Sequence, residues 1–392
     1  MTRNVNRNRI LAGLALAGTA AVTTLPAANG DIPIFQPTTI TQPGRYVVTR
    51  DITAQGDVIV LQTGGVTLDL NGHTIRSVTG SGVVIDIVGL PTPPCNIVAN
   101  GRIAGGDTGI KGVNLPAVMP VIIEKVGIIG PMFDCINMSP GKVEVRGSVL
   151  RECGRNGIRM SGGGGVLEVE DTLITDVQAS GVFADDIGGA TVRASTIRRF
   201  GLDGNQAGGV RMTSPGKLGL FVVDSVLGDG SALGAGLLLE LAGLKGPVSI
   251  AGNQIAGNGA SGIDLRQGAA RITGNTITGN LGEGIRLDAV GIVTPSMISG
   301  NSILDNSLNG ASILAGVARF NGNTVGGNLL DGVRIGGLRA FIENNFLQGN
   351  GGFGLSFLNG PTHAYRGNFV RGNNGGDIQD LFGNTDGGGN IK

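Results

Sequence analysis

A motif of about 20 residues recurs along the second half of the chain and restricts the possible folds. The stretch RITGNTITGNLGEGIRLDAV at 271–290 repeats SIAGNQIAGNGASGIDLRQG at 249–268, which stands 22 residues earlier. Each copy carries two asparagines and a glycine at fixed offsets. The first asparagines are Asn253, Asn275, Asn301, Asn323, Asn345 and Asn368, the second are Asn258, Asn280, Asn306, Asn328, Asn350 and Asn373, and the glycines are Gly262, Gly284, Gly310, Gly332 and Gly354. A period in the low twenties predicts a solenoid in which each coil is one repeat.

The apolar residues of each repeat alternate with polar ones, which indicates strands. Apolar side chains stand three residues before the first asparagine, two residues after it, and at the first and third positions after the glycine. The position two residues after the asparagine is occupied by Ile255, Ile277, Ile303, Val325, Leu347 and Val370. A period of two is that of a strand with one buried face. The sequence therefore predicts an all-β parallel β-helix of about fifteen coils of about 22 residues, with three short strands per coil and no helix beside them.

The asparagine and glycine columns are expected at the corners between strands. Both residue types tolerate the left-handed backbone that a sharp corner needs, and stacked asparagine amides can form a hydrogen-bonded ladder. This structural role is preferred over a role for the asparagines as sugar ligands. The pattern extends into the first half of the chain, with Ser148 and Thr172 in the first asparagine column and Gly157 and Gly181 in the glycine column.

Composition supports thin aliphatic coils and narrows the choice of partners. The 392 residues include 73 Gly, 12 Phe, 2 Tyr and no Trp, so the core must be built from Val, Ile, Leu and Ala. The net charge is zero, and no basic tract predicts a nucleic-acid partner. With two histidines and no GGxGxD run, the sequence predicts neither a metal site nor a cofactor.

The N-terminal residues have the features of a secretory signal. Three arginines precede the apolar run ILAGLALAGTAAVTTL, and small residues at 28–30 offer a cleavage site before Asp31. An uncleaved anchor is the alternative, but the run is short of strongly apolar residues. We expect a signal peptide at 1–30, one β-helix domain with its N-terminal cap segment at 31–384, and a flexible tail at 385–392. The mature chain is expected to be a monomer without membrane insertion, secreted, periplasmic or on the cell surface.

The few cysteine and histidine residues are expected to be structural. Cys95, Cys135 and Cys153 fit no metal-binding spacing. We expect two or three of them to be small buried side chains, and a Cys135–Cys153 bridge is the alternative. His363 and Tyr365 fall in columns occupied by apolar residues in neighbouring repeats and are expected to point inward.

Two stretches resemble a known superfamily. VTLDLNGHTI at 66–75, followed by the GN-T-I-x-x-N…GI-x-L series, is similar to the right-handed parallel β-helix repeat proteins of the pectate-lyase-like superfamily. PGRYVVTRDI at 43–52 looks like the N-terminal segment of its secreted bacterial members. The resemblance extends from about Ile40 to Gly383. It implies a right-handed β-helix but says little about function, because the superfamily includes lyases, hydrolases, epimerases and adhesins.

The resemblance also directs attention to one face of the solenoid. In sugar-active members, the Gly-I-x-L strand and the loop before it form the active face. The outward residues of this strand are Arg159, Phe183, Arg211, Leu238, Asp264, Arg286, Ser312, Arg334 and Ser356, and the residues before the glycine include Asn156, Ser180, Ser261, Glu283, Asn309, Asp331 and Phe353. Over four coils these columns bring together a polar patch of Asp264, Glu283, Arg286, Asn309, Asp331 and Arg334.

A carboxylate pair in this patch suggests catalysis. Glu283 and Asp331 lie two coils apart, ~10 Å between backbones, and carboxylates separated by ~6.5–9.5 Å suit an inverting glycosidase. In this interpretation Glu283 and Asp331 are catalytic, while a second set of residues binds the ligand: Asp264, Arg286, Asn309 and Arg334. Arginines hold a uronate carboxylate by paired hydrogen bonds. The competing interpretation is a set of solvated charges, with Arg286 and Asp264 paired across coils.

Two functions therefore stay open. The GHG and RIK signatures of the related hydrolases and the Tyr-Gly-x-Asp-Pro-His-type motif of the related epimerases are absent, and exposed aromatic residues are few. These absences favour a secreted or cell-surface protein without catalytic activity, with a structural, adhesive or weak glycan-binding role. The alternative is a lyase-like or hydrolase-like enzyme that acts on a uronate-containing polysaccharide. In both cases the expected partner is an acidic polysaccharide or a cell-surface glycan.

Overall fold

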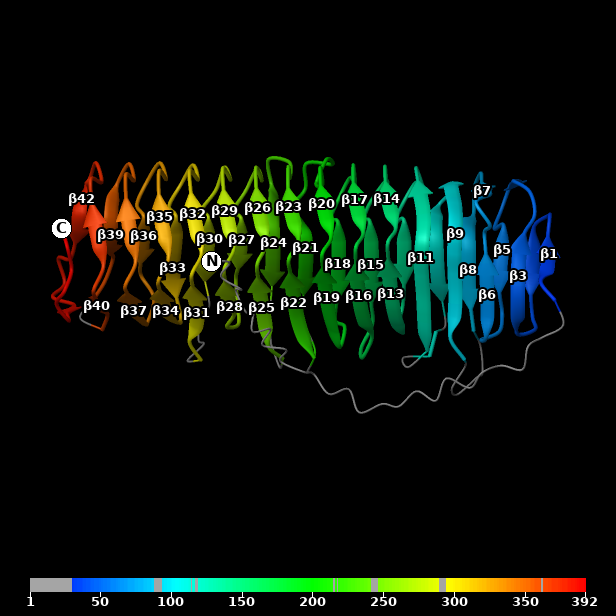
Figure 1. The fold of residues 1–392 in the computed structure, drawn as a ribbon, viewed down its shortest axis with the longest axis horizontal. Coiled ribbons are helices and arrows are strands. Elements are labelled where there is room, and N and C mark those ends of the chain that lie inside the picture. The colour runs from blue at the N-terminus through cyan, green and yellow to red at the C-terminus, as the bar shows by residue number, and fades with distance from the viewer. Residues whose placement is uncertain are drawn as a thin grey trace, which may run out of the picture.

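The chain folds into one elongated stack of coils, seen from the side in Figure 1. The computed structural model describes residues 30–87, 94–113, 115–116, 119–213, 216, 218–240, 246–288, 294–360 and 362–392. These residues form 43 strands, which pair in parallel with their equivalents in the next coil. The predicted signal peptide lies outside the described residues, apart from Gly30. The described residues contain no helix that is long and apolar enough to cross a membrane.

One side of the stack is a 15-stranded sheet built from the Gly-I-x-L strands. Its strands are β2 (Thr38–Ile40), β5 (Ile59–Leu61), β8 (Ser81–Asp86), β10 (Thr108–Val113), β12 (Ile136–Met138), β15 (Ile158–Ser161), β18 (Val182–Asp185), β21 (Ala207–Thr213), β24 (Gly234–Glu240), β27 (Ile263–Leu265), β30 (Ile285–Asp288), β33 (Ala311–Ala315), β36 (Val333–Ile335), β39 (Phe353–Phe357) and β42 (Gly376–Gln379). Fifteen strands in this sheet agree with the predicted number of coils.

The other two sides belong to one 28-stranded sheet. The first run is β1 (Ile32–Ile34), β3 (Gly44–Val48), β6 (Val66–Asp69), β9 (Asn96–Gly105), β11 (Pro120–Ile129), β13 (Lys142–Arg146), β16 (Val166–Glu170), β19 (Gly189–Arg193), β22 (Gly219–Val223), β25 (Val248–Ala251), β28 (Arg271–Thr273), β31 (Ser296–Ser299), β34 (Val317–Asn321), β37 (Arg339–Glu343), β40 (Ala364–Arg366) and β43 (Thr385–Asp386). The second is β4 (Ile52–Ala54), β7 (Thr74–Ser77), β14 (Val149–Arg151), β17 (Leu173–Thr175), β20 (Thr196–Arg198), β23 (Val226–Gly228), β26 (Gln254–Ala256), β29 (Thr276–Thr278), β32 (Ser302–Leu304), β35 (Thr324–Gly326), β38 (Phe346–Gln348) and β41 (Phe369–Arg371). The long strands β9 and β11 pass through both runs and join them.

The interior is a continuous aliphatic core, as the alternation predicts. Ile277 and Val325 are fully buried, and so is every other member of their column. His363 and Tyr365 also point inward, with exposed fractions of 1% and 6%. The largest fully buried side chains include only three aromatic residues, and the rest of the core is built mainly from isoleucine, leucine and valine.

Both asparagine columns form buried ladders. Asn301 is typical: its Oδ1 accepts from the backbone N and the Nδ2 of Asn275, both at about 3 Å, and its own Nδ2 donates to Asn323 Oδ1 and to the Ile272 carbonyl at 2.9 Å. The second column repeats this arrangement from Asn258 to Asn373. Each amide therefore satisfies backbone and side-chain groups of neighbouring coils, which is the structural role predicted for it.

The expected reason for the corner residues requires a correction. Left-handed backbone occurs at the residue before each ladder position, as at Gly274 (φ 65°), Gly300 (φ 64°) and Asn344 (φ 54°), and not at the ladder asparagine. The members of the glycine column do not have a positive φ, so the left-handed backbone does not explain why glycine occurs there. A Cβ on Gly284 would lie 2.5 Å from the Gly310 carbonyl oxygen and 2.5 Å from Ile303 Cγ2. Close approach of successive coils thus requires glycine there.

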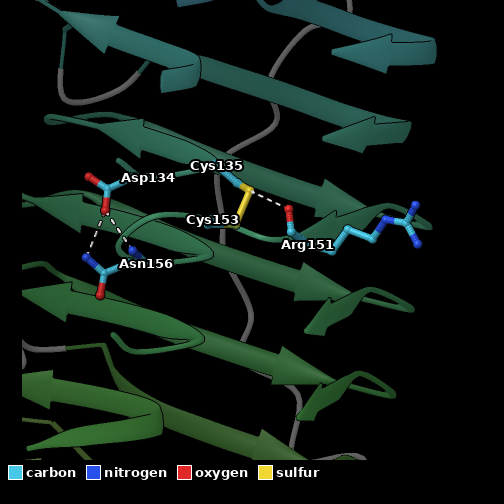
Figure 2. The surroundings of a disulfide bond; sticks show 5 residues. All are labelled: Asp134, Cys135, Arg151, Cys153 and Asn156. Atoms are coloured by element: carbon cyan, nitrogen blue, oxygen red, sulfur yellow. Dashed lines mark hydrogen bonds between the residues drawn. A yellow bond between two sulfur atoms is a disulfide. The ribbon is translucent and has the colours of Figure 1, made fainter. Parts of the chain in front are cut away.

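A disulfide replaces the glycine–asparagine corner in one pair of coils. Cys135 and Cys153 are bonded, with Cα atoms 5.4 Å apart, so the expectation of unbonded buried thiols is wrong for these two and the alternative is confirmed (Figure 2). Cys135 stands in the glycine column and Cys153 in the second asparagine column, positions that touch across coils elsewhere, as Gly262 and Asn280 do. Neighbouring coils thus bring the two sulfur atoms into reach.

Cys95 is the third cysteine and carries a free, half-buried thiol. Burial raises the pKa of this thiol to about 11, so that little thiolate forms at neutral pH.

The final residues complete the stack. Thr385–Asp386 form β43 beside β40, Asn390 Oδ1 accepts from Asn368 N at 3.0 Å, and Ile391 forms a bridge with Phe369. These contacts hold the segment 385–392, for which the sequence suggests a flexible tail, against the last coil.

Candidate functional site

The outward column of the 15-stranded sheet forms the candidate site. Backbone pairing aligns the nine outward residues in the predicted order, from Arg159 beside Phe183 in β15 and β18 to Arg334 beside Ser356 in β36 and β39. Because the strands are parallel and in register, each outward side chain lies ~4.8 Å from the next. We call the part from Arg159 to Arg334 the outer column. Side chains from eight coils therefore share one straight line along the solenoid.

An aromatic ring stands near the N-terminal end of the outer column. The guanidinium carbon of Arg159 lies 5.9 Å from the centre of the Phe183 ring, and that of Arg211 lies 5.3 Å from it. Arg159, Phe183 and Arg211 occupy consecutive strands, so the ring has a cation on each side. The arrangement holds two positive charges in fixed positions about two strands apart.

A charged network follows immediately along the column. Glu240 accepts from Arg211 Nη2 through Oε2 at 3.0 Å and from Arg266 Nη1 through Oε1 at 3.1 Å. Arg266 also contacts Asp264 Oδ2 through Nε and Nη2, at 3.1 and 3.0 Å. The Gln206 side chain accepts a further bond from Arg266. The network thus fixes Asp264, whose exposed fraction is 7%, by one of its two carboxylate oxygens.

Three atoms of the outer column have no partner. Among the residues that the structure describes, the buried side-chain nitrogen and oxygen atoms without a hydrogen bond are Arg159 Nε, Arg286 Nε and Asp264 Oδ1. Asp264 and Arg286 pair directly in β27 and β30. A buried polar atom without a partner is uncommon and costs ~1–3 kcal/mol. All three exceptions fall on one line of one face.

The structure places the six residues of the predicted patch in two different surroundings. Asp264, Arg286 and Arg334 belong to the outer column, where Asp264 forms its ion pair with Arg266 rather than with Arg286. The Arg286 guanidinium instead lies 3.8 Å from an oxygen of Asp288. The predicted pairing of Arg286 with Asp264 is therefore wrong, because Arg266 reaches Asp264 from the same strand end.

Glu283, Asn309 and Asp331 lie at the corner before the glycine. Asp331 Oδ1 accepts from the backbone N of Phe353 at 2.8 Å, and the Asp331 N donates to Asn309 Oδ1 at 2.9 Å. Glu283 accepts from Ser261 Oγ at 3.1 Å. Asn309 is 3% exposed. Asp331 and Asn309 thus satisfy backbone groups of adjacent coils, as the ladder asparagines do, and the coil of Asn309 separates Glu283 from Asp331.

The residues directly before the glycine form a third ladder, which could have been predicted from the sequence. In the first half of the chain, Asp134 Oδ1 accepts from both the N and the Nδ2 of Asn156, as Figure 2 shows. Asn156 Oδ1 accepts from Ser180 N, and Ser180 Oγ accepts from Gly208 N. Short polar residues directly before the glycine are the sequence signal of this ladder.

Glu240 and Arg266 are the site residues that sequence reasoning missed. Both stand in the next outward column, two residues after the outer column, and a strand period of two predicts that they share its face. Their long side chains choose among several partners, and a sequence does not show which. Among the described residues, no group of three or more His, Cys, Asp or Glu side chains is arranged to hold a metal ion.

One protein-family comparison agrees with the coil architecture in the middle of the chain. Residues 134–289 match the family model described as right handed beta helix region, whereas no curated protein sequence matches the chain. The periplasmic alginate epimerase AlgG is 13% identical over 88% of this chain and 77% of that chain, with a TM-score of 0.34. The A-module of the mannuronan C-5 epimerase AlgE4 from Azotobacter vinelandii is 15% identical over 88% of this chain and 90% of that chain, with a TM-score of 0.40.

Tailspike protein 3 of bacteriophage CBA120 is 11% identical over 87% of this chain and 56% of that chain, with a TM-score of 0.44. The family match covers residues 134–289, which is less than half of the chain, and the stacked parallel coils continue the same architecture through the other described residues, as the repeat predicts.

Proposed function

We propose that the outer column binds an acidic polysaccharide and that the protein is a glycan-binding β-helix without catalytic activity. The observation that carries the proposal is the set of unpartnered buried atoms, Arg159 Nε, Asp264 Oδ1 and Arg286 Nε, on one line of the 15-stranded sheet. The other buried side-chain nitrogen and oxygen atoms of the described residues all have hydrogen-bond partners, so these three atoms are the ones whose hydrogen-bonding capacity the fold leaves unused.

The chemistry of the three atoms defines the partner. A guanidinium Nε–H donates and needs an acceptor such as a carboxylate or hydroxyl oxygen, whereas the Asp264 oxygen accepts and needs a hydroxyl donor. A uronate residue supplies a carboxylate and hydroxyl groups on one ring. The straight outer column presents these groups along many coils, which suits an extended polymer better than a compact molecule. Arg211, Arg334 and the ring of Phe183 lie on the same line and extend the proposed contact.

The contacts of the carboxylates support binding over catalysis. A general acid and a general base must both face the bond that is cleaved. Asp331 is occupied by the backbone of the next coil and Glu283 by Ser261. The enzyme alternative, with Glu283 and Asp331 as the catalytic pair, stays a prediction that enzyme assays address directly.

The binding proposal is tested by affinity measurements on purified protein. We expect polygalacturonate or alginate to bind wild-type protein, and neutral dextran not to bind. Arg286→Gln should weaken binding about tenfold, since a hydrogen bond to a charged group contributes ~1.5–3 kcal/mol. Arg371→Gln, on the exposed surface of β41, serves as the matched control and should bind like wild type. Equal affinity of the wild-type and Arg286→Gln proteins would contradict the proposal.

The enzyme alternative is tested with the same polymers. Incubation followed by assays for unsaturated uronate products and for new reducing ends should give no signal above a blank. If wild-type protein produces either signal and both Glu283→Gln and Asp331→Asn lose it while they stay folded, the catalytic interpretation replaces the binding one. Activity that survives both substitutions excludes this pair as the catalytic site.

A further inference from the structure

Near the C-terminal end, the 28-stranded sheet carries an aromatic ring with an empty place beside it. Phe341 in β37 pairs with Ala364 in β40, whose methyl group leaves the space next to the ring unfilled. The equivalent place on the adjoining run is filled: Phe369 pairs with Phe346, and the two rings stack with centres 4.7 Å apart and planes inclined by 5°. A hollow of about 280 Å³, lined by Phe341, Ala364 and the neighbouring residues, lies at the unfilled place.

Two arginines surround Phe341 without a carboxylate partner. The guanidinium carbons of Arg319 and Arg339 lie 5.3 and 5.0 Å from the centre of the ring. Both side chains are exposed, and within the described residues neither forms an ion pair. Glu343, on the same strand as Phe341, is already bonded to Arg366 at 2.8 Å. The Phe341 ring therefore has two uncompensated positive charges beside it. Arg339 lines the hollow, whereas Arg319 stands in β34, on the other side of Phe341 from Ala364.

The remaining lining residues of the hollow carry no charge: Leu338 is apolar, whereas Thr362, His363 and Thr385 are polar. Thr362 Oγ1 donates to the Leu338 carbonyl at 2.9 Å and keeps its lone pairs for another donor, and the Thr385 side chain is exposed. His363 is buried, accepts from Ala340 N through Nδ1, and contacts Asn359 Oδ1 through Nε2. Burial lowers the pKa of His363, so that the ring is neutral at neutral pH. The hollow thus offers hydroxyl groups, one aromatic face and one guanidinium group, that of Arg339.

We propose that this hollow is a second binding site, which takes a single six-membered ring that carries a carboxylate. The ring of the ligand stacks on Phe341 where Phe369 stacks on Phe346, and its carboxylate pairs with Arg339. A sugar acid and an aromatic acid share this chemistry. The site lies on the 28-stranded sheet and involves no residue of the outer column, so it does not depend on the function proposed for that column.

Ligand-observed nuclear magnetic resonance and calorimetry with galacturonate, benzoate and galactose test the proposal. Binding of galacturonate but not galactose identifies a sugar-acid site, and binding of benzoate alone identifies an aromatic-acid site. Binding of neither acid to the wild-type protein would overturn the proposal.

Two substitutions locate the bound acid. Ala364→Phe fills the empty place and should weaken binding at least about tenfold, and Arg339→Gln should do so without changing the core. Circular dichroism and thermal unfolding show whether each variant is folded, and if Ala364→Phe does not fold, Arg339→Gln decides alone. Unchanged affinity in the folded variants contradicts the site. If Arg286→Gln removes the binding and Arg339→Gln does not, the acid occupies the outer column and the second site is excluded.

Discussion

The corners of the coils and the outer column use buried polar groups in opposite ways. At the corners, each ladder amide donates and accepts within the stack, as Asn301 does with two neighbouring asparagines and the carbonyl of Ile272. On the outer column, Arg286 Nε and Asp264 Oδ1 are buried beside each other's strands without any partner. The difference teaches that this fold readily satisfies polar groups where they hold coils together. The unsatisfied groups are the observation on which the proposed binding role rests.

Loss of a ladder amide should have the largest effect on stability. Asn301→Ala removes the acceptor of the Asn275 backbone N, the side-chain donor to the Ile272 carbonyl and the amide hydrogen bonds to Asn275 and Asn323, and we expect a loss of ~4 kcal/mol at ~1–3 kcal/mol per buried group. Ser225→Ala removes only the Ser225 Oγ bonds to Ser195 N and to the Val223 carbonyl and should lose about half as much. Urea denaturation of both variants measures the two values. Equal losses of stability in the two variants would contradict the expectation that a ladder asparagine contributes more than a ladder serine.

The disulfide should be the next largest contribution. It closes a segment with a sequence separation of 18, for which the chain-entropy estimate is ~3 kcal/mol. The double variant Cys135→Ser with Cys153→Ser should unfold at correspondingly lower urea concentration. Wild-type protein under reducing conditions should match it, and a reduced protein as stable as the oxidised one would show that the corner contacts alone hold these coils together.

Replacement of an arginine should lower the free energy of unfolding more at a corner than in the outer column. Arg155 donates to Asp134, which is fully buried, and Arg155→Met should cost ~2 kcal/mol because a buried carboxylate loses its charged partner. Arg286→Met removes a guanidinium that lies 3.8 Å from a partly exposed carboxylate and whose Nε has no partner, so stability should fall by no more than ~0.5 kcal/mol while polysaccharide binding falls. A large loss of stability in Arg286→Met would mean that the outer column serves the fold.

Substitutions at the left-handed corner residues should give the smallest changes in stability. The change should be positive for Ala194→Gly and negative for Gly274→Ala. Ala194 has a φ of 48° and precedes Ser195, the position that Gly274 occupies before Asn275. Left-handed backbone costs an L-residue ~1–2 kcal/mol, so Ala194→Gly should stabilise the protein by up to about that amount. Gly274→Ala should destabilise it similarly, since a Cβ there meets no other atom and only the backbone term changes. Changes of the same sign in both variants would contradict this account of the corner.

The sequence allowed prediction of those features that depend on the repeat alone. Because a strand has a period of two and coils stack in register, the burial of Ile277 and Val325 and the order of the outward residues followed from the spacing. The ladder of Asn253 through Asn368 followed for the same reason. Residues that recur with the period of the repeat occupy equivalent positions in successive coils.

Features that occur at a single place in the stack could not be predicted from the repeat. The left-handed residues Ala194 and Arg199 are poor candidates by residue type, and only the column identifies them. Asp264 was correctly placed in its column but wrongly paired, because Arg266 and Arg286 both stand next to it along the backbone and side-chain conformation decides which of them binds it. Cys135 and Cys153 occupy different columns, so that their contact depends on how one coil sits on the next.

The most direct test of the proposed role of the outer column is a crystal structure of the protein with a bound uronate oligosaccharide. We expect the oligosaccharide to lie along the outer column, with an acceptor atom within hydrogen-bond distance of Arg286 Nε and a hydroxyl group that donates to Asp264 Oδ1. A complex in which the oligosaccharide binds elsewhere, while these two atoms contact only ordered water, would contradict the account.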